Sequence, residues 1–346
     1  MRILSPSSVP LSKICSARID NYMMYLKVLL GFVFLLGSAD ILVRGAVGLA
    51  NRMNISPLVI GMTIIAFGTS APELLVSLDA ALTGSSAMAL GNVIGSNMAN
   101  MLLIVGAAAL LRPISIKPYA LLRDGMMLLF SSLLFAWFCW MGPIEHWQGV
   151  VLLFVLVVFL VRAYWRDSHD GGLSAEIHRE EIKEFEGLKS LRVIWMAVFA
   201  GLAGLVLGAD LLVSGGVEVA RVHGVAEEVI GLTVLAIGTS LPELAASVVA
   251  ALRGHTDVAL GNVVGSNLFN ILAVIGTVAV VTPLQVPQQV LDFDLWLMLG
   301  VTILMLPYFI GGWRLGRPTA AAFLVGYTAY VAAQAYGVPK LMAFIG

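Results

Sequence analysis

The chain has 346 residues, of which 59% are hydrophobic and only 12% charged, with a net charge of −1 and a mean hydropathy of +0.94. Soluble domains carry about 25% charged residues, so this composition excludes a soluble globular protein and predicts one surrounded by lipid. The near-neutral charge excludes a nucleic-acid-binding surface, and two cysteines with five histidines exclude a disulfide framework or a Cys/His metal site. We therefore expect no cofactor.

Ten apolar stretches are each long enough to cross a bilayer, because a core of about 30 Å takes roughly 20 helical residues. Residues 1–24 precede them as an N-terminal tail, and the only long charged segment, 167–192, separates the fifth stretch from the sixth. The stretches lie near 26–50, 57–83, 86–111, 121–141, 146–166, 193–220, 227–253, 256–281, 291–311 and 318–337. The sequence therefore predicts an all-α polytopic membrane protein with two five-helix units, 25–166 and 193–346, joined by a linker.

The two units repeat each other. Residues 59–114 align without a gap to residues 229–284 at a constant offset of 170, with 29 of 56 positions identical. Because each unit has an odd number of spans, the second unit would enter the membrane from the opposite face. We therefore predict two inverted-topology repeats, an arrangement found in secondary transporters.

The basic residues predict the orientation of these spans. Loops on the linker's side hold 14 of the 20 Lys and Arg residues, and the other side holds six. Cytoplasmic loops collect Lys and Arg, so we expect residues 167–192 to be cytoplasmic and both termini to lie outside. The predicted location is the cell membrane, which in a bacterium is the inner membrane.

Each unit carries the same Gly- and Pro-containing motif in mid-span, GTSAPE at 68–73 and GTSLPE at 238–243. Proline removes a backbone donor and frees a carbonyl of the preceding turn. Unpaired backbone within a membrane is tolerated where it lines a cavity or binds an ion, so the carbonyls near Ala66 and Ala236 are candidate ligands. A simple proline kink is the alternative, but it does not explain the acid that follows in both units.

Those acids, Glu73 and Glu243, lie near the centres of their spans, where an ionisable side chain costs about 2.5–3.5 kcal/mol. No Lys or Arg at matching depth in either span can neutralise them, so a bound cation or a proton is the expected partner. Helical spacing places a hydroxyl group one turn before each acid, at Thr69 and Thr239, and a serine one turn after it. The alternative, a protonated Glu in one packing hydrogen bond, would suit one unit better than both.

The next span of each unit begins with GNxxGSN, at 91–97 and 261–267. The spaced glycines predict close packing between helices. For Asn92 and Asn262, helix packing and ion ligation are equal alternatives. For the polar residues further along the same helix face ligation is favoured, because hard cations prefer clustered oxygens; these are Ser96, Asn100, Ser266 and Asn270.

Four further acids have simpler interpretations. Asp40 and Asp210 occupy equivalent positions, and Arg44 lies one turn after Asp40, which predicts an interfacial ion pair. Asp124 and Asp294 begin their spans and are predicted to act as N-terminal caps. None of the four is expected to ligate the central ion.

Two carboxylates with hydroxyl, amide and carbonyl oxygens suit hard cations such as Ca²⁺ or Na⁺. At these paired motifs the sequence resembles the calcium/cation antiporter superfamily, specifically bacterial sodium/calcium exchangers, over nearly the whole chain. The resemblance implies exchange of Ca²⁺ for Na⁺ by alternating access. It also implies a ligand set of Thr69, Ser70, Glu73, Ser96, Asn100, Thr239, Ser240, Glu243, Ser266 and Asn270, with the carbonyls of Ala66 and Ala236. Some relatives have Asp where this chain has Asn270, so only two acids are expected at the centre.

The predicted function is therefore a secondary Na⁺/Ca²⁺ antiporter, in which the first and sixth spans slide past a fixed core. Its expected partners are Ca²⁺, Na⁺ and the lipid bilayer, with K⁺ or H⁺ as alternative coupling ions. A passive cation channel is a second alternative. An intramembrane enzyme with a carboxylate acid/base pair is a third, and the absence of a neighbouring nucleophile or His in the motifs argues against it.

Overall fold

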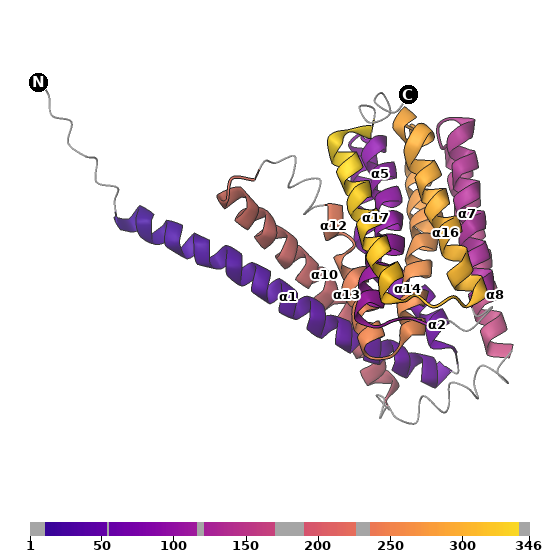
Figure 1. The fold of residues 1–346 in the computed structure, drawn as a ribbon, viewed down its shortest axis with the longest axis horizontal. Coiled ribbons are helices and arrows are strands. Elements are labelled where there is room, and N and C mark those ends of the chain that lie inside the picture. Colours follow the sequence, from indigo (N-terminus) through magenta and orange to yellow (C-terminus); the bar gives the residue numbers. More distant parts are fainter. Residues whose placement is uncertain (1–10, 54, 116–120, 170–189, 226–235, 339–346) are drawn as a thin grey trace, which may run out of the picture.

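The computed structural model describes residues 11–53, 55–115, 121–169, 190–225 and 236–338. Within them every regular element is a helix (Figure 1). The first half contains α1 (Leu11–Met53), α2 (Pro57–Ile60), the π-helical turn η1 (Gly61–Ile65), α3 (Ala66–Thr69), α4 (Ala71–Leu82), α5 (Ser86–Met98), the π-helical turn η2 (Ala99–Ile104), α6 (Val105–Leu111), α7 (Leu122–Met141) and α8 (His146–His169). The second half contains α10 (Leu191–Val222), α12 (Ala236–Gly238), α13 (Leu241–Leu252), α14 (Thr256–Leu268), the π-helical turns η4 (Phe269–Ile275) and η5 (Val290–Asp294), α15 (Gly276–Val281), α16 (Leu295–Gly311) and α17 (Arg317–Tyr336).

Several of these helices can cross a membrane, so the chain is a multi-pass integral membrane protein. In the described residues seven are long and apolar enough, and the pair α2–α3 and α4, bent by 43°, makes an eighth if it is one span. The predicted span at 227–253 falls partly outside the described residues, and its described part, α13, is a shorter apolar helix. The tenth predicted span coincides with α17, which is long enough but less apolar. The total of ten therefore stays a prediction.

Two helical rods form the centre of the bundle. In Ser86–Leu111 and Thr256–Val281, 78% and 83% of the residues of the most apolar window are buried, against 28–44% in the other long spans. Small residues explain this burial, because the glycines of the second GNxxGSN motif bring α14 against the backbone of α2 and η1 at Leu58 and Met62. The equivalent glycines, Gly91 and Gly95, have no such close neighbour among the described residues. Their counterpart segment, 226–235, lies outside that part of the chain.

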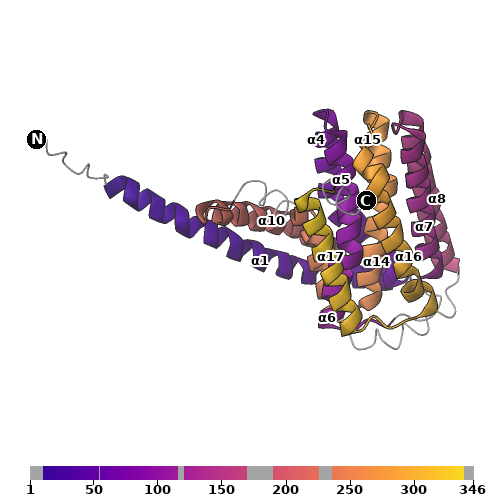
Figure 2. The ribbon, with the colours of Figure 1, turned by 45° about the horizontal axis from the view of Figure 1, so that its top comes forward.

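The long helices α1 and α10 lie side by side and slant away from the upright bundle (Figures 1 and 2). Glycines form their contact: a Cβ on Gly31 would lie 2.5 Å from the backbone N of Leu212, and one on Gly208 would lie 2.7 Å from that of Leu35. An ion pair of 2.5 Å between Lys27 and Glu218 joins the same two helices. They therefore pack together as one unit. Because α1 already begins at Leu11, residues 11–24 of the predicted tail form its first turns.

The predicted ion pair of Asp40 is confirmed and extends to the other half. Arg44 donates to Asp40 Oδ2 at 2.9 Å, and Arg253, just after α13, lies 2.6 Å from Oδ1. The bridge joins α1 to the second half.

Repeated positions also make equivalent backbone contacts across the halves. Ile114 exchanges two hydrogen bonds with Leu315, at 2.9 and 3.1 Å. Leu284, which corresponds to Ile114 in the sequence repeat, exchanges two with Ile144, both of 2.9 Å. Each bridge therefore ties a loop of one half to a loop of the other.

The predicted cap at Asp294 is wrong. Its carboxylate accepts from Gln334 of α17 at 2.5 Å and from Gln289 at 3.2 Å, and it does not cap α16. Gln289 also donates to the side-chain oxygen of Gln334 at 2.9 Å. Hydrogen bonds from a neighbouring helix stabilise a buried carboxylate more than capping a helix end would, because few other donors reach it inside the protein. The cluster joins η5 to α17.

The α1–α10 contact gives the first prediction. Gly31→Ala should lower the free energy of unfolding by about 1–3 kcal/mol, because the added methyl group would overlap the α10 backbone. Gly37→Ala in the same helix is the matched control, since a Cβ there meets no described atom within 4 Å. Thermal unfolding of the purified protein in detergent measures both. Equal stability of the two variants would contradict the close packing of these helices.

Candidate cation site

The site begins where two helices are broken. In the first half α3 ends at Thr69, Ser70 adopts φ −84° and ψ 6°, and α4 begins at Ala71 with Pro72 in its first turn. In the second half the described helix α12 ends at Gly238 and α13 begins two residues after Thr239. Proline suits the first turn because its missing N–H would have no intrahelical acceptor there. The motif therefore ends one helix and starts another in mid-span.

The two acids occupy the first turns of the helices that follow the breaks. Glu73 in α4 and Glu243 in α13 are each 1% exposed. A helix N-terminus carries a partial positive charge, which favours a carboxylate at this position. The two carboxylates lie close enough to act on each other through their charges. Each half therefore contributes one buried acid to a common centre.

Serines at each break contact the acid or ligand candidates of the other half. The hydroxyl of Ser70 donates to Glu243 Oε1 at 3.0 Å, and Ser240 and Thr239 lie beside Glu73. Ser240 Oγ is also 3.5 Å from Ser96 Oγ on α5. The centre is thus assembled from both halves.

Thr69 lies across the break from Glu73, so the two residues are not one turn apart on a single helix, as helical spacing predicted. Its hydroxyl lies 3.1 Å from the carbonyl of Ile65, 3.4 Å from Asn262 Oδ1, and beside Glu243 of the other half. The bend at Ser70 turns the side chain toward α14. Thr69 is therefore still one of the oxygens of the centre, but it lies beside residues of the second half rather than beside Glu73.

The motif asparagines fix helices to each other. Asn92 donates to Ser77 Oγ at 2.9 Å and to the Glu73 carbonyl at 3.3 Å. Asn262 makes the equivalent bonds, to Ser247 Oγ at 3.0 Å and to the Glu243 carbonyl at 3.4 Å. Of the two alternatives for this pair the structure therefore favours packing, because both amide nitrogens bond the backbone and serine of an acid-bearing helix.

Asn100 and Asn270 lie in π-helical turns, η2 and η4, at equivalent positions. Such turns shift the helix register and are frequent at functional sites. The turn with Asn100 packs against α13, which carries Glu243, and the turn with Asn270 packs against α4, which carries Glu73. Asn270 Nδ2 donates to Asn97 Oδ1 at 3.1 Å, which leaves its own oxygen unpaired.

Many buried oxygens of the predicted set lack a hydrogen-bond partner within the described residues. A buried polar atom without a partner costs about 1–3 kcal/mol, so a cluster of them at one centre indicates a ligand that satisfies them. The atoms are Glu73 Oε2, Asn100 Oδ1, Thr239 Oγ1, Glu243 Oε2, Ser266 Oγ and Asn270 Oδ1.

The two predicted backbone ligands, the carbonyls of Ala66 and Ala236, differ in their hydrogen bonds. The carbonyl of Ala66 accepts the N–H of Ser70 at 2.9 Å and lies 3.4 Å from the hydroxyl of Thr69, so it is not free. In the second half the N–H of Ser240 donates instead to the carbonyl of Ile237, at 3.1 Å. Ala236, the first residue of α12, stays a prediction from the sequence repeat.

The donor set fits a hard cation. It consists of carboxylate, hydroxyl and amide oxygens, the ligands of Ca²⁺ and Na⁺, and it holds no thiolate or imidazole. No three His, Cys, Asp or Glu side chains in the described part of the chain cluster together, so neutral oxygens would complete the coordination of any ion.

Sequence reasoning missed Asn97 of this centre, the π-helical turns around it, and the cluster at Asp294. Asn97 is fully buried and accepts a hydrogen bond from Asn270. Its place in the repeated GSN motif was a signal that could have identified it. The π-helical turns have no periodic signature in the sequence. The Asp294 cluster depends on Gln334, 40 residues away, and no local pattern predicts it.

Comparison with known proteins identifies the family. The profile of the family described as Sodium/calcium exchanger protein matches residues 24–165 and 193–336. CaxA of Alkalimonas amylolytica, which carries a provisional antiporter name, is 40% identical over 81% of this chain and 87% of its own. The sodium/calcium exchanger MaX1 of Methanosarcina acetivorans is 32% identical over 90% of this chain and 98% of its own.

A solved structure shares the fold. The sodium–calcium exchanger NCX_Mj, soaked with Na⁺ and Ca²⁺, superposes with a TM-score of 0.77 at 28% identity, over 90% of this chain and 98% of its own. These matches confirm the resemblance found in the paired motifs. The chain therefore belongs to the sodium/calcium exchanger family, a family of membrane cation antiporters.

Proposed function

We propose that this protein exchanges Ca²⁺ for Na⁺ across the membrane by alternating access at the centre formed by Glu73 and Glu243. The observation that carries the proposal is the pair of carboxylates, one from each half, buried beside oxygens that have no described partner. In their ionised form the two acids need a compensating cation here, since each charge alone costs about 2.5–3.5 kcal/mol.

The proposed ligands come from both halves of the chain. The acids would supply the charge, and hydroxyl and amide oxygens around them would replace the ion's hydration shell. The set is Glu73, Glu243, Thr69, Ser70, Ser96, Asn100, Thr239, Ser240, Ser266 and Asn270, with the carbonyls of Ala66 and Ala236 as the weakest members. Ca²⁺ and Na⁺ both accept such oxygens, so one centre can serve both ions in turn.

The proposed architecture is ten spans in two inverted repeats, 25–166 and 193–346, with residues 167–192 as the linker. The equivalent backbone bridges at Ile114 and Leu284 support it, because each repeated position contacts the other half. The close packing of α1 with α10 supports a moving unit made of these two helices. Such a unit would open the fixed centre to either face in turn.

Ca²⁺ uptake into proteoliposomes, driven in turn by outward gradients of Na⁺, K⁺ or H⁺, tests the function. We expect uptake against a Ca²⁺ gradient only when Na⁺ moves in the opposite direction. Uptake driven by a pH gradient alone, or a requirement for K⁺, would assign one of the alternative coupling ions. Ca²⁺ flux that needs no opposing ion would show a channel and refute the exchange.

Substitution of the acids tests the site. Glu73→Gln and Glu243→Gln should each slow Na⁺-driven Ca²⁺ uptake at least about 100-fold, because each removes a charged ligand whose contact contributes roughly 3 kcal/mol. Glu145→Gln, at an exposed position between α7 and α8, is the matched control and should transport at the parental rate. Elution as a single peak in size exclusion checks folding. Parental uptake by either site variant would assign that glutamate to packing.

Cysteine labelling tests the proposed orientation, with both termini outside and the linker in the cytoplasm. In a chain without its two native cysteines, Ser190→Cys at the start of α10 should resist an impermeant thiol reagent in right-side-out vesicles. Thr83→Cys, between α4 and α5, should react at once. The reverse pattern would invert the orientation and refute the proposed cytoplasmic linker.

A further inference from the structure

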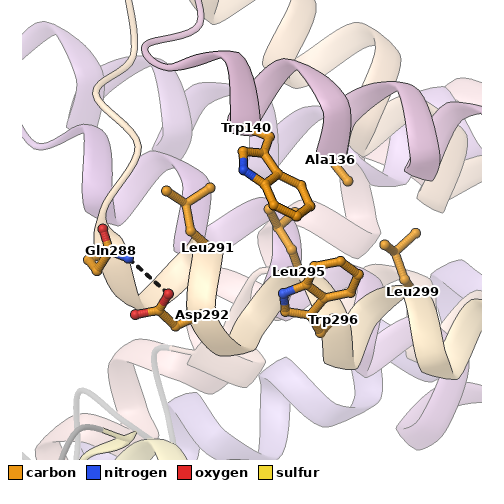
Figure 3. Close-up of a pocket in the computed structure, with 8 residues that line it drawn as sticks. All are labelled: Ala136, Trp140, Gln288, Leu291, Asp292, Leu295, Trp296 and Leu299. Atoms are coloured by element: carbon orange, nitrogen blue, oxygen red, sulfur yellow. Dashed lines mark hydrogen bonds between the residues drawn. The ribbon is translucent and has the colours of Figure 1, made fainter.

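A cavity opens at the periphery of the bundle, and none of the candidate cation ligands lines it. It has a volume of about 400 Å³ and is lined by residues of α7, η5 and α16, with α16 packed against both other elements. Figure 3 shows the eight residues that line it, which are Ala136, Trp140, Gln288, Leu291, Asp292, Leu295, Trp296 and Leu299. They include one carboxylate and no Lys or Arg.

The two polar lining residues precede Trp296 along the helix, and leucines lie between and beyond them, at Leu291, Leu295 and Leu299. Gln288 and Asp292 come first, at the start of the span Val290–Gly311. Trp296 follows one turn further along, and Leu299 lies about one turn beyond it. A membrane span enters the lipid at its end, so Gln288 and Asp292 face the head groups, and Leu295 and Leu299 face the acyl chains. This order matches the order of groups in a phospholipid.

Two indole rings form the middle of the cavity. Trp140, near the end of α7, and Trp296 of α16 meet edge to face, with ring centroids 5.7 Å apart and planes at 89°. Both side chains are more than half exposed, so their faces are open to lipid. Because the two rings are perpendicular, they present one aromatic face and one aromatic edge to the same bound group, which a single interfacial tryptophan cannot do.

The charge of the lining selects the bound group. Asp292 is exposed, and its carboxylate accepts one hydrogen bond, from Gln288 at 2.8 Å, which leaves acceptor capacity on its oxygens. A carboxylate beside indole faces attracts an ammonium group, by charge and by cation–π contact. The two indole N–H groups, on the side of the rings nearer Asp292 in Figure 3, can donate to a phosphate oxygen.

We propose that this cavity binds a phospholipid whose head group carries a primary ammonium, with the ammonium at Asp292, the phosphate at the indole N–H groups and one acyl chain along Leu295 and Leu299. A primary ammonium fits better than a quaternary one, because only its N–H groups can donate to the carboxylate. The proposal needs only that the chain is a membrane protein, so it does not depend on which ions are exchanged.

Native mass spectrometry of the full-length protein, delipidated in detergent, tests the proposal. Phosphatidylethanolamine, phosphatidylcholine and phosphatidylglycerol with identical acyl chains are added in turn. We expect the ethanolamine lipid to be retained most. Asp292→Asn and Trp140→Leu should each weaken its retention roughly fivefold, the factor for a contact of about 1 kcal/mol.

Matched controls separate the cavity from the general surface. Glu145→Gln removes a carboxylate near the same end of α7, and Trp137→Leu removes an exposed indole from the same helix outside the cavity. Neither should change lipid retention. Because all four side chains are exposed, the variants should fold, and thermal unfolding in detergent without lipid checks this.

Three results would overturn the proposal. Equal retention of the ethanolamine and glycerol lipids would exclude an ammonium site. Equal retention of the choline lipid would exclude the hydrogen bond to Asp292. A dimer that dissociates on Trp140→Leu, with unchanged lipid retention, would show that a second copy of the chain covers the cavity instead.

Discussion

The burial of two like charges at the centre of an apolar bundle is the constraint on which the other features of this protein depend. Glu73 and Glu243 are almost completely buried, and each would cost several kcal/mol if left without compensation. The breaks before α4 and α13 supply helix N-termini at the acids, and Ser70 supplies a donor to Glu243. Several neutral oxygens of the same motifs have no hydrogen-bond partner among the described residues. The described residues alone therefore compensate the charges only in part, and the proposed cation would complete the balance.

Neither half can build this centre alone. Ser70 donates a hydrogen bond to Glu243 of the other half, and the Thr69 hydroxyl lies 3.4 Å from Asn262. Asn270 donates to Asn97 across the same boundary. These contacts need the helix backbones to approach closely, which the glycines of α14 permit and larger side chains would prevent. The second copy of the motif thus combines glycines that bring the halves together with Asn262, which bonds within its own half and lies 3.4 Å from Thr69 of the other.

The sequence predicted the membrane class, the acids and the paired motifs, because a buried charge in both copies of a repeat has few interpretations. It could not predict the local geometry. Helical spacing placed Thr69 beside Glu73 on one helix, but the bend at Ser70 turns it toward the other half. The π-helical turns at Asn100 and Asn270 add a residue to a helical turn without any change in hydrophobic pattern. Asp294 looked like a cap because its partner, Gln334, lies on a distant helix.

Asn270 limits the charge of the proposed site. Its amide nitrogen donates to Asn97 Oδ1, so its own oxygen, which has no partner among the described residues, is available as a neutral ligand of the proposed site. A carboxylate at this position would have no N–H for Asn97 Oδ1, so the Asn97 amide would have to turn over and give up the contact of its Nδ2 with Met298. The amide therefore suits its neighbour, and the centre keeps two ionisable acids. One Ca²⁺ or two Na⁺ ions neutralise two carboxylates. A third Na⁺ would leave a net positive charge in a low-dielectric interior, where an unbalanced charge is costly.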